Sequence, residues 1–301
     1  MLRLAYDGMK YAPKMVIQDI GLELGIMLHG RYTLKEYLSI GQTSLLYLAY
    51  DEQEKRKVAV KEFCPYAYAN RDLNRKSVVC KSEKYHTQFL KMLQAFEREC
   101  EILKSLTNQL LGKQASVVAW KDSFAANETR YLVMEYIEGI DLNQALEVGA
   151  IKNYKATIRQ IIRMVQTVHK AGILHLDLKP SNIYMDKKGG LKLIDFGSAR
   201  YLSDAEQEFS FATMGYSAPE LFSGEKVSRA SDIYSLGAII YYFTTGHIPD
   251  NSKERLVEDR LPSISEYVTV PAILEQNIMK CLALKPEQRL RNLSFLGFLL
   301  L

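Results

Sequence analysis

Hydrophobic and polar residues alternate in short segments over the first part of the chain. Segments 31–40, 44–51 and 57–63 are rich in Tyr, Leu and Val and are separated by charged or turn-forming residues, a pattern typical of antiparallel strands. Residues 86–106 place apolar side chains at nearly helical spacing, which predicts a long amphipathic helix. Segments 116–125 and 129–137 predict two more strands.

Beyond residue 141 the pattern changes from strand to helix. Helical spacing predicts one helix over 155–170, an apolar helix over 231–245 and a later helix near 271–284. The intervening stretch, 172–200, is short, irregular and rich in polar groups. Polar groups that are not part of a regular element are candidates for chemistry.

These patterns predict an α+β fold with two lobes in one domain. Residues 31–137 would form a lobe of antiparallel sheet with one long helix, and residues 138–301 a mainly helical lobe. Residues 1–30 show no clear period and are treated as an N-terminal extension. A cleft between two lobes is a favoured place for a ligand.

Composition narrows the class of protein. The 301 residues are 48% hydrophobic and 25% charged, which is typical of a soluble globular protein. The 39 basic and 35 acidic residues are interspersed, so no nucleic-acid arm is expected. The four cysteines form no CxxC pair, which favours a reducing, cytoplasmic setting. No segment approaches the length of about 18 to 20 apolar residues that spans a bilayer.

Two motifs in the irregular stretch carry the chemistry. The first is HLDLKPSN, 175–182, and the second is DFG, which begins at Asp195, 18 residues after Asp177. Acids and an amide on two loops can hold a divalent metal on phosphate oxygens while another group handles an acceptor hydroxyl. A lone Asp or Asn in a loop is usually a turn or cap residue, but the joint spacing makes coincidence improbable.

Together, these motifs resemble those of the eukaryotic-type (Hanks-type) protein kinase family, over about residues 31–290, with bacterial-like features around 248–261. The resemblance implies Ser/Thr specificity and ATP with Mg²⁺, or alternatively Mn²⁺, as cofactors. It implies that Asp177 is the catalytic base and that Lys179 stabilises the transferring phosphate. Asn182 and Asp195 would bind the metal, because hard oxygen ligands suit it.

The same resemblance assigns an ion pair to the first lobe. VAVK, which ends at Lys61, resembles the strand that carries the ATP-binding lysine of the family. Its partner would be Glu99, selected over Glu97 and Glu101 by the spacing of the apolar residues on the helix. This pair would mark the active conformation. Taken alone, Glu99 is more often a solvated helix residue.

The segment YLVMEYIEGIDL resembles the hinge of the family, where backbone groups bind adenine and an acid reaches the ribose. Apolar residues in strands are core residues by default, and only the resemblance makes them pocket candidates. The expected nucleotide-binding residues are Leu38, Gly41, Leu46, Ala59, Lys61, Met134, Glu135, Ile137, Asp141 and Tyr184.

Further motifs resemble those of protein kinases rather than small-molecule kinases. Ala218 begins APE, and Thr213, five residues earlier, matches a threonine near the catalytic aspartate. Asp232 matches the acid that supports the catalytic loop. Arg289 matches the arginine that pairs with Glu220.

Two departures from the family pattern concern activity and its control. In the glycine-rich loop only Gly41 remains, with Ser39 and Ser44 replacing two glycines, so weaker nucleotide binding or slower turnover is expected. Leu176 replaces the arginine of HRD, which predicts activity without phosphorylation of the activation segment. The hydroxyl candidates there are Ser198, Ser203 and Ser210.

A third departure is the long connection between Lys61 and Glu99. Its residues 64–85 could hold an added hairpin and dock a regulatory partner, because long connections in compact domains tend to be functional or disordered. The apolar end, 295–301, is expected to pack on the body of the protein.

The sequence therefore predicts an active serine/threonine protein kinase that acts on protein hydroxyls. A second interpretation is a pseudokinase or scaffold that binds nucleotide weakly and docks a partner. A third, a small-molecule phosphotransferase, is disfavoured by Glu220, Asp232 and Arg289.

Overall fold

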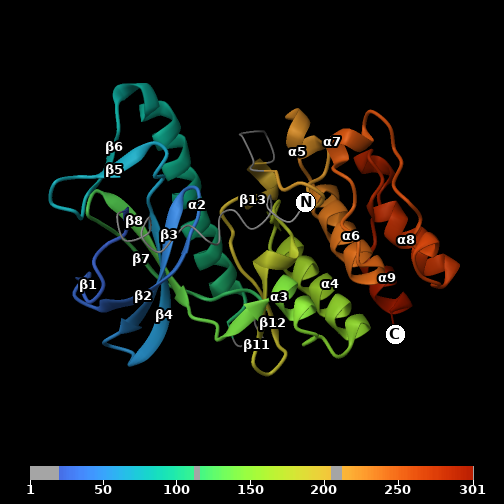
Figure 1. Ribbon diagram of the computed structural model, residues 1–301, viewed down its shortest axis with the longest axis horizontal. Coiled ribbons are helices and arrows are strands. Elements are labelled where there is room, and N and C mark those ends of the chain that lie inside the picture. The colour runs from blue at the N-terminus through green and yellow to red at the C-terminus, as the bar shows by residue number, and fades with distance from the viewer. Residues whose placement is uncertain (1–19, 112–115, 205–211, 301) are drawn as a thin grey trace. The chain divides into compact units, whose positions relative to one another are not determined.

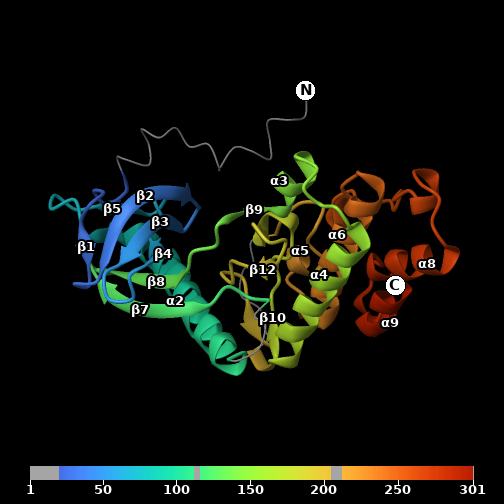
Figure 2. The ribbon, with the colours of Figure 1, turned by 90° about the horizontal axis from the view of Figure 1, so that it is seen from below.

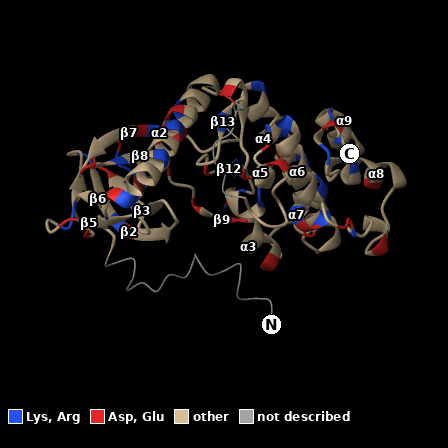
Figure 3. Ribbon diagram, turned by 90° about the horizontal axis from the view of Figure 1, so that it is seen from above, with Lys and Arg blue, Asp and Glu red and all other residues tan. Residues whose placement is uncertain are grey.

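A computed structural model of the chain describes residues 20–111, 116–204 and 212–300. These residues form two compact units, the first from residues up to 107 with 118–136, and the second from 108–117 with residues from 137 onward. Figure 1 shows the sheet-rich first unit and the helix-rich second unit. Basic and acidic residues are interspersed along the ribbon of both units (Figure 3).

The first unit is built on one antiparallel sheet with the strand order β1-β2-β3-β4-β8-β7. Its strands are β1 (Met27–Leu28), β2 (Tyr32–Ile40), β3 (Ser44–Asp51), β4 (Arg56–Phe63), β7 (Trp120–Ala126) and β8 (Thr129–Glu135). Helix α2 (His86–Gln109) lies alongside the sheet, and its buried apolar face includes Phe96, Ile102 and Leu103. The predicted pattern of sheet plus long helix is confirmed.

One strand begins later than expected. The sequence predicted a strand over 116–125, but β7 starts at Trp120. The residues before it pair elsewhere, because Val117 forms a parallel bridge to Leu193 and the Ser116 carbonyl accepts a hydrogen bond from the Leu193 amide at 2.9 Å. Ser116, Val117 and Leu193 all belong to the second unit.

The long connection after β4 contains a small hairpin. Strand β5 (Ala69–Arg71) pairs with β6 (Val78–Cys80) in an antiparallel arrangement. Although Leu73 at its tip is almost fully exposed, the Arg71 side chain is buried. The Arg71 side chain therefore lies in the interior of the first unit rather than on its surface.

The second unit is mainly helical. Its helices are α3 (Leu142–Glu147), α4 (Tyr154–Lys170), α5 (Glu220–Ser223), α6 (Arg229–Thr245), α7 (Ser252–Arg255), α8 (Ala272–Cys281) and α9 (Leu293–Leu299). Its short strands are β9 (Gly139–Asp141), β10 (Ile173–Leu174), β11 (Ile183–Asp186), β12 (Leu191–Leu193) and β13 (Arg200–Tyr201). Short 3₁₀ turns connect several of these elements.

Helix α6 lies at the centre of the second unit and is buried on nearly all sides, as expected of a helix that is apolar all round. Ser228 and Ser231 form a capping box at the start of the helix, and Gly246, at φ 76°, ends the helix. Helix α4 lies beside it (Figure 2). Helix α8 approaches closely at Gly237, where an added Cβ would lie 2.6 Å from the Cβ of Cys281.

The apolar end of the chain packs through one side of α9. Leu293, Leu296 and Leu300 are buried, whereas Phe298 is exposed. Leu301, most of the predicted N-terminal extension (1–19) and Ser210 lie outside the described residues. Across the described ranges, no helix is both long and apolar enough to cross a bilayer.

An ion pair between Arg31 and Asp51 at the start of the sheet predicts an acid-dependent loss of stability. Arg31 donates to both oxygens of the fully buried Asp51 carboxylate at 2.7 and 2.8 Å. The hydrogen bonds from Arg31 lower the pKa of Asp51 from 3.8 to about 2. A carboxyl group with a lowered pKa stabilises the fold above its unfolded-state pKa and loses that contribution as pH falls.

We therefore expect Asp51→Asn to lower the free energy of unfolding by about 2 kcal/mol at pH 7. The difference from wild type should shrink between pH 4 and pH 2, measured by urea unfolding. The exposed neighbour Glu54 provides the control Glu54→Gln, for which little change is expected. A difference that stays constant down to pH 2 would contradict the assignment.

Candidate active site

The first unit holds the predicted ion pair. Lys61, on β4, donates from Nζ to both Glu99 carboxylate oxygens, at 2.7 and 2.8 Å. Both side chains are largely buried. The structure thus brings together two residues 38 positions apart, and it selects Glu99 over the exposed Glu101 and over Glu97, which contacts Arg130.

Four predicted nucleotide-binding residues share one face of the sheet. Strand register places Leu46 opposite Lys61 and Ala59 opposite Met134. Because alternate residues of a strand face the same side, these four side chains lie together. Leu38 lies near the end of β2, and Gly41 donates from its amide to the Ser44 carbonyl at 2.8 Å, closing the turn between β2 and β3. Glu135, at the end of β8, accepts from the Ala119 amide.

The opposite face of the sheet carries a polar cluster that the sequence analysis missed. Glu62 is fully buried, and its two oxygens accept hydrogen bonds from Arg71, from Tyr47 at 2.7 Å and from Tyr131 at 2.7 Å. Burial and the nearby Glu62 charge raise the pKa of both tyrosines. Arg71 also donates to the Ile20 carbonyl at 2.8 Å. Glu62 could have been noticed in the sequence, because it is an acidic residue at a buried position of a strand whose other buried residues are apolar.

The second unit gathers the residues of HLDLKPSN around the Asp177 carboxylate. Lys179 Nζ lies 2.8 and 3.0 Å from its two oxygens, and the Asn182 amide donates at 2.9 Å. Thr213 donates to the same carboxylate at 2.7 Å and accepts from Lys179 at 3.1 Å. Ser217 in turn accepts from the Thr213 amide. Two donors from the same loop and one from a distant segment, Thr213, therefore fix the orientation of one carboxylate.

Two backbone conformations in these loops are unusual. Leu176, at φ 63°, and Asp195, at φ 58°, are both in the left-handed region, which is sparsely populated by residues other than glycine and is enriched at functional sites. Leu176 is buried, whereas Asp195 is exposed and accepts from the Gly197 amide at 3.3 Å.

Asp232, at the start of α6, holds the loop that carries Leu176. Its buried carboxylate accepts hydrogen bonds from the His175 and Leu176 amides at 2.9 and 2.8 Å and contacts His169 Nε2 at 2.8 Å. Burial alone would raise the pKa of Asp232, but these hydrogen bonds and the neighbouring imidazoles outweigh it, so the pKa is lowered. Burial lowers the pKa of His175, which favours the neutral imidazole.

The remaining predicted residues also belong to the second unit. Asp141 ends β9 and caps α3 by accepting from the amides of Asn143 and Gln144. Tyr184 pairs with Asp141 across β9 and β11. Ile137 is partly buried just before β9. Farther away, Arg289 binds both oxygens of the buried Glu220 at 2.6 and 2.8 Å.

Comparison with known proteins identifies the family. Residues 32–295 match the protein kinase domain. The chain is 28% identical over 285 residues to a probable serine/threonine-protein kinase of Clostridium acetobutylicum, covering 89% of this chain and 39% of that protein. It is 32% identical over 228 residues to the serine/threonine-protein kinase Pkn1 of Myxococcus xanthus, covering 69% and 32%. The chain thus spans well under half the length of these relatives.

A solved structure has the same fold. The apo form of PpkA-294 matches with a TM-score of 0.75 and 25% identity, over 93% of this chain and 99% of that one. The chain belongs to the protein kinase family. Membership implies ATP and a divalent metal in general terms.

Proposed function

We propose that this chain is an active serine/threonine protein kinase. The observation that carries the proposal is the Asp177 carboxylate, oriented by Lys179, Asn182 and Thr213. A carboxylate held by several donors is poised to accept a hydroxyl proton in a defined direction. The serine/threonine kinases among the relatives support the specificity for aliphatic hydroxyls.

In the proposed reaction, Asp177 accepts the proton of a serine or threonine hydroxyl as its oxygen attacks the γ-phosphorus of ATP. The bond between the γ-phosphorus and the bridging oxygen breaks, and ADP leaves with the electron pair. Lys179 stabilises the negative charge on the transferring phosphoryl group. The hydroxyl of Thr213 holds Lys179 and Asp177 in place, because it accepts a hydrogen bond from Lys179 and donates one to Asp177.

Asn182 and Asp195 are the residues that would hold the metal. The Asn182 side chain donates to Asp177 through its amide nitrogen, which leaves its amide oxygen as a ligand atom. Asp195 contributes an exposed carboxylate. Mg²⁺ prefers oxygen ligands and is usually held by one or two protein groups plus substrate phosphates, so this donor set fits. When bound, Mg²⁺ supplies neutralisation of phosphate charge.

For the nucleotide, we propose that Lys61 neutralises the inner phosphates. Glu99 orients the ammonium group through two short hydrogen bonds. The apolar face formed by Leu46, Ala59 and Met134 would contact adenine. The resemblance of the segment YLVMEYIEGIDL to the hinge of the family supports the proposed contact with adenine.

Phosphosite mapping tests the specificity. The chain would be incubated with ATP, Mg²⁺ and a generic basic protein, and modified residues identified by mass spectrometry. Phosphoserine and phosphothreonine are the expected products. Phosphotyrosine alone would contradict the proposed specificity.

The altered glycine loop should limit nucleotide affinity. Ser39 and Ser44 carry side chains where glycine would let backbone amides approach phosphate closely. We expect Ser39→Gly with Ser44→Gly to tighten ATP binding several-fold, about 1 kcal/mol or less, measured by fluorescence titration. Ser265→Gly, in an exposed 3₁₀ turn, is the control. Unchanged or weaker ATP binding by the double variant would show that the two serines do not limit the nucleotide affinity of the loop.

A further inference from the structure

A basic pocket lies in the second unit, among α4, the start of α6 and the start of α9. It has a volume of about 270 Å³. Its lining residues include Gln166, His169, Lys170, Arg229, Arg291 and Ser294. Three of these side chains carry a fixed positive charge and none is acidic, so the pocket attracts anions.

The cations of the pocket retain unused hydrogen-bond donors. Arg229 donates one hydrogen bond, from Nη2 to the His169 carbonyl at 2.9 Å, and a guanidinium has five donors. Within the described part of the chain, the side chains of Lys170 and Arg291 take part in no ion pair or hydrogen bond. Among the described residues, no acidic side chain forms an ion pair with these three charges.

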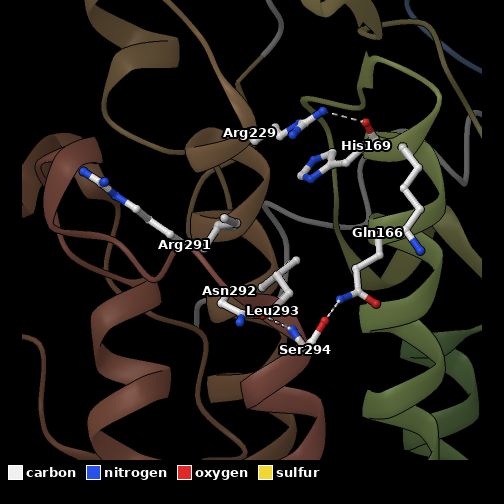
Figure 4. A pocket seen from close by; sticks show the side chains of 9 residues that line it. Gln166, His169, Arg229, Arg291, Asn292, Leu293 and Ser294 are labelled. Atoms are coloured by element: carbon white, nitrogen blue, oxygen red, sulfur yellow. Dashed lines mark hydrogen bonds between the residues drawn. The ribbon is translucent and has the colours of Figure 1, made fainter.

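Figure 4 shows how these side chains lie. The Arg229 guanidinium reaches toward the His169 carbonyl, and Gln166 donates to the Ser294 hydroxyl at 3.0 Å on the other side of the pocket. The guanidinium of Arg291 extends away from these residues. Because its side chain is long and exposed, it can turn toward a bound anion without displacing a partner.

The negative charge of Asp232 lies behind the pocket. Asp232 is buried beyond the His169 ring, but its carboxylate already receives two backbone amides and contacts that ring. Its charge is therefore largely compensated within the protein.

We propose that this pocket binds a phosphate monoester group. A phosphate monoester carries close to two negative charges at pH 7 and three acceptor oxygens, which suits a guanidinium fork together with a lysine ammonium. The group can be carried by a phosphorylated serine or threonine of a protein or by a free metabolite. This site is separate from Asp177, and its test does not depend on the proposed catalytic function.

The test is isothermal titration calorimetry of the full chain with O-phospho-L-serine, a phosphoserine peptide and the same peptide without phosphate. The main variant is Lys170→Gln with Arg291→Gln, which removes two exposed, unpaired charges and should not disturb folding. The control is Lys253→Gln with Lys280→Gln, which removes the same net charge from exposed positions outside the pocket.

The pocket variant should bind both phosphate probes at least about tenfold more weakly than wild type, and the control variant within about twofold. A second variant, Arg229→Lys, keeps the charge but loses the fork and should also weaken binding. Tighter binding of the phosphopeptide would indicate a protein-borne group, whereas equal binding would indicate a metabolite. Absence of binding, or equal weakening in pocket and control variants, would overturn the proposal.

Discussion

Replacing Asp177 with asparagine is expected to lower the rate of phosphoryl transfer by about 10²- to 10⁴-fold, the usual contribution of a positioned general base. The amide cannot accept the hydroxyl proton, although it keeps the size of the carboxylate. It also loses the charge that holds Lys179 at 2.8 Å. The measurement is the initial rate of transfer from labelled ATP to a generic protein substrate.

The control for this variant is Asp250→Asn, which changes an exposed aspartate outside the site. Its rate should equal that of wild type. ATP binding by Asp177→Asn, followed by thermal stabilisation, should persist, because the proposed nucleotide contacts lie elsewhere. If wild type and Asp177→Asn transferred phosphate equally slowly, the alternative of a pseudokinase or scaffold would be favoured.

Replacing Arg71 with methionine is expected to lower the free energy of unfolding by about 3 to 5 kcal/mol, because it leaves the buried Glu62 carboxylate without its cation. Among the described residues, Tyr47 and Tyr131 alone would still donate to Glu62. The hydrogen bond from Arg71 to the Ile20 carbonyl would also be lost. Urea unfolding measures the change.

The matched control is Lys76→Met, an exposed change in the same hairpin, for which a change within about 0.5 kcal/mol is expected. Adding Glu62→Gln to Arg71→Met should recover part of the loss, because a neutral amide is less costly to bury than an unpaired carboxylate. A loss below about 1 kcal/mol for Arg71→Met alone would show that the pair contributes little.

Local patterns in the sequence predicted the long strands of the first unit and the helices α2, α4, α6 and α8, but not the short strands and helices. The apolar spacing of 86–106 predicted α2, and the alternation of 44–51 predicted β3, because periodicity reflects burial directly. The start of β7 was predicted wrongly because Val117 pairs with Leu193, a contact between distant segments that no local pattern shows.

Partnerships between distant side chains were predictable only through the family resemblance. It led to the pair of Lys61 and Glu99, and to that of Glu220 and Arg289, both present in the structure. It offered nothing for Arg71, because the insert that carries this residue is not part of the family pattern. The burial of Arg71 depends on the hairpin packing on the sheet, and the sequence analysis had assigned its region to partner binding.

The roles proposed for Asp177, Lys179 and Lys61 all require that the chain transfers phosphate from ATP. The most direct measurement is incorporation of the labelled γ-phosphate of ATP into a protein acceptor by wild type, with Mg²⁺ present and with the metal chelated. Metal-dependent incorporation that continues over many turnovers is the predicted result. No incorporation above that of a heat-denatured sample, with nucleotide bound or not, would contradict it.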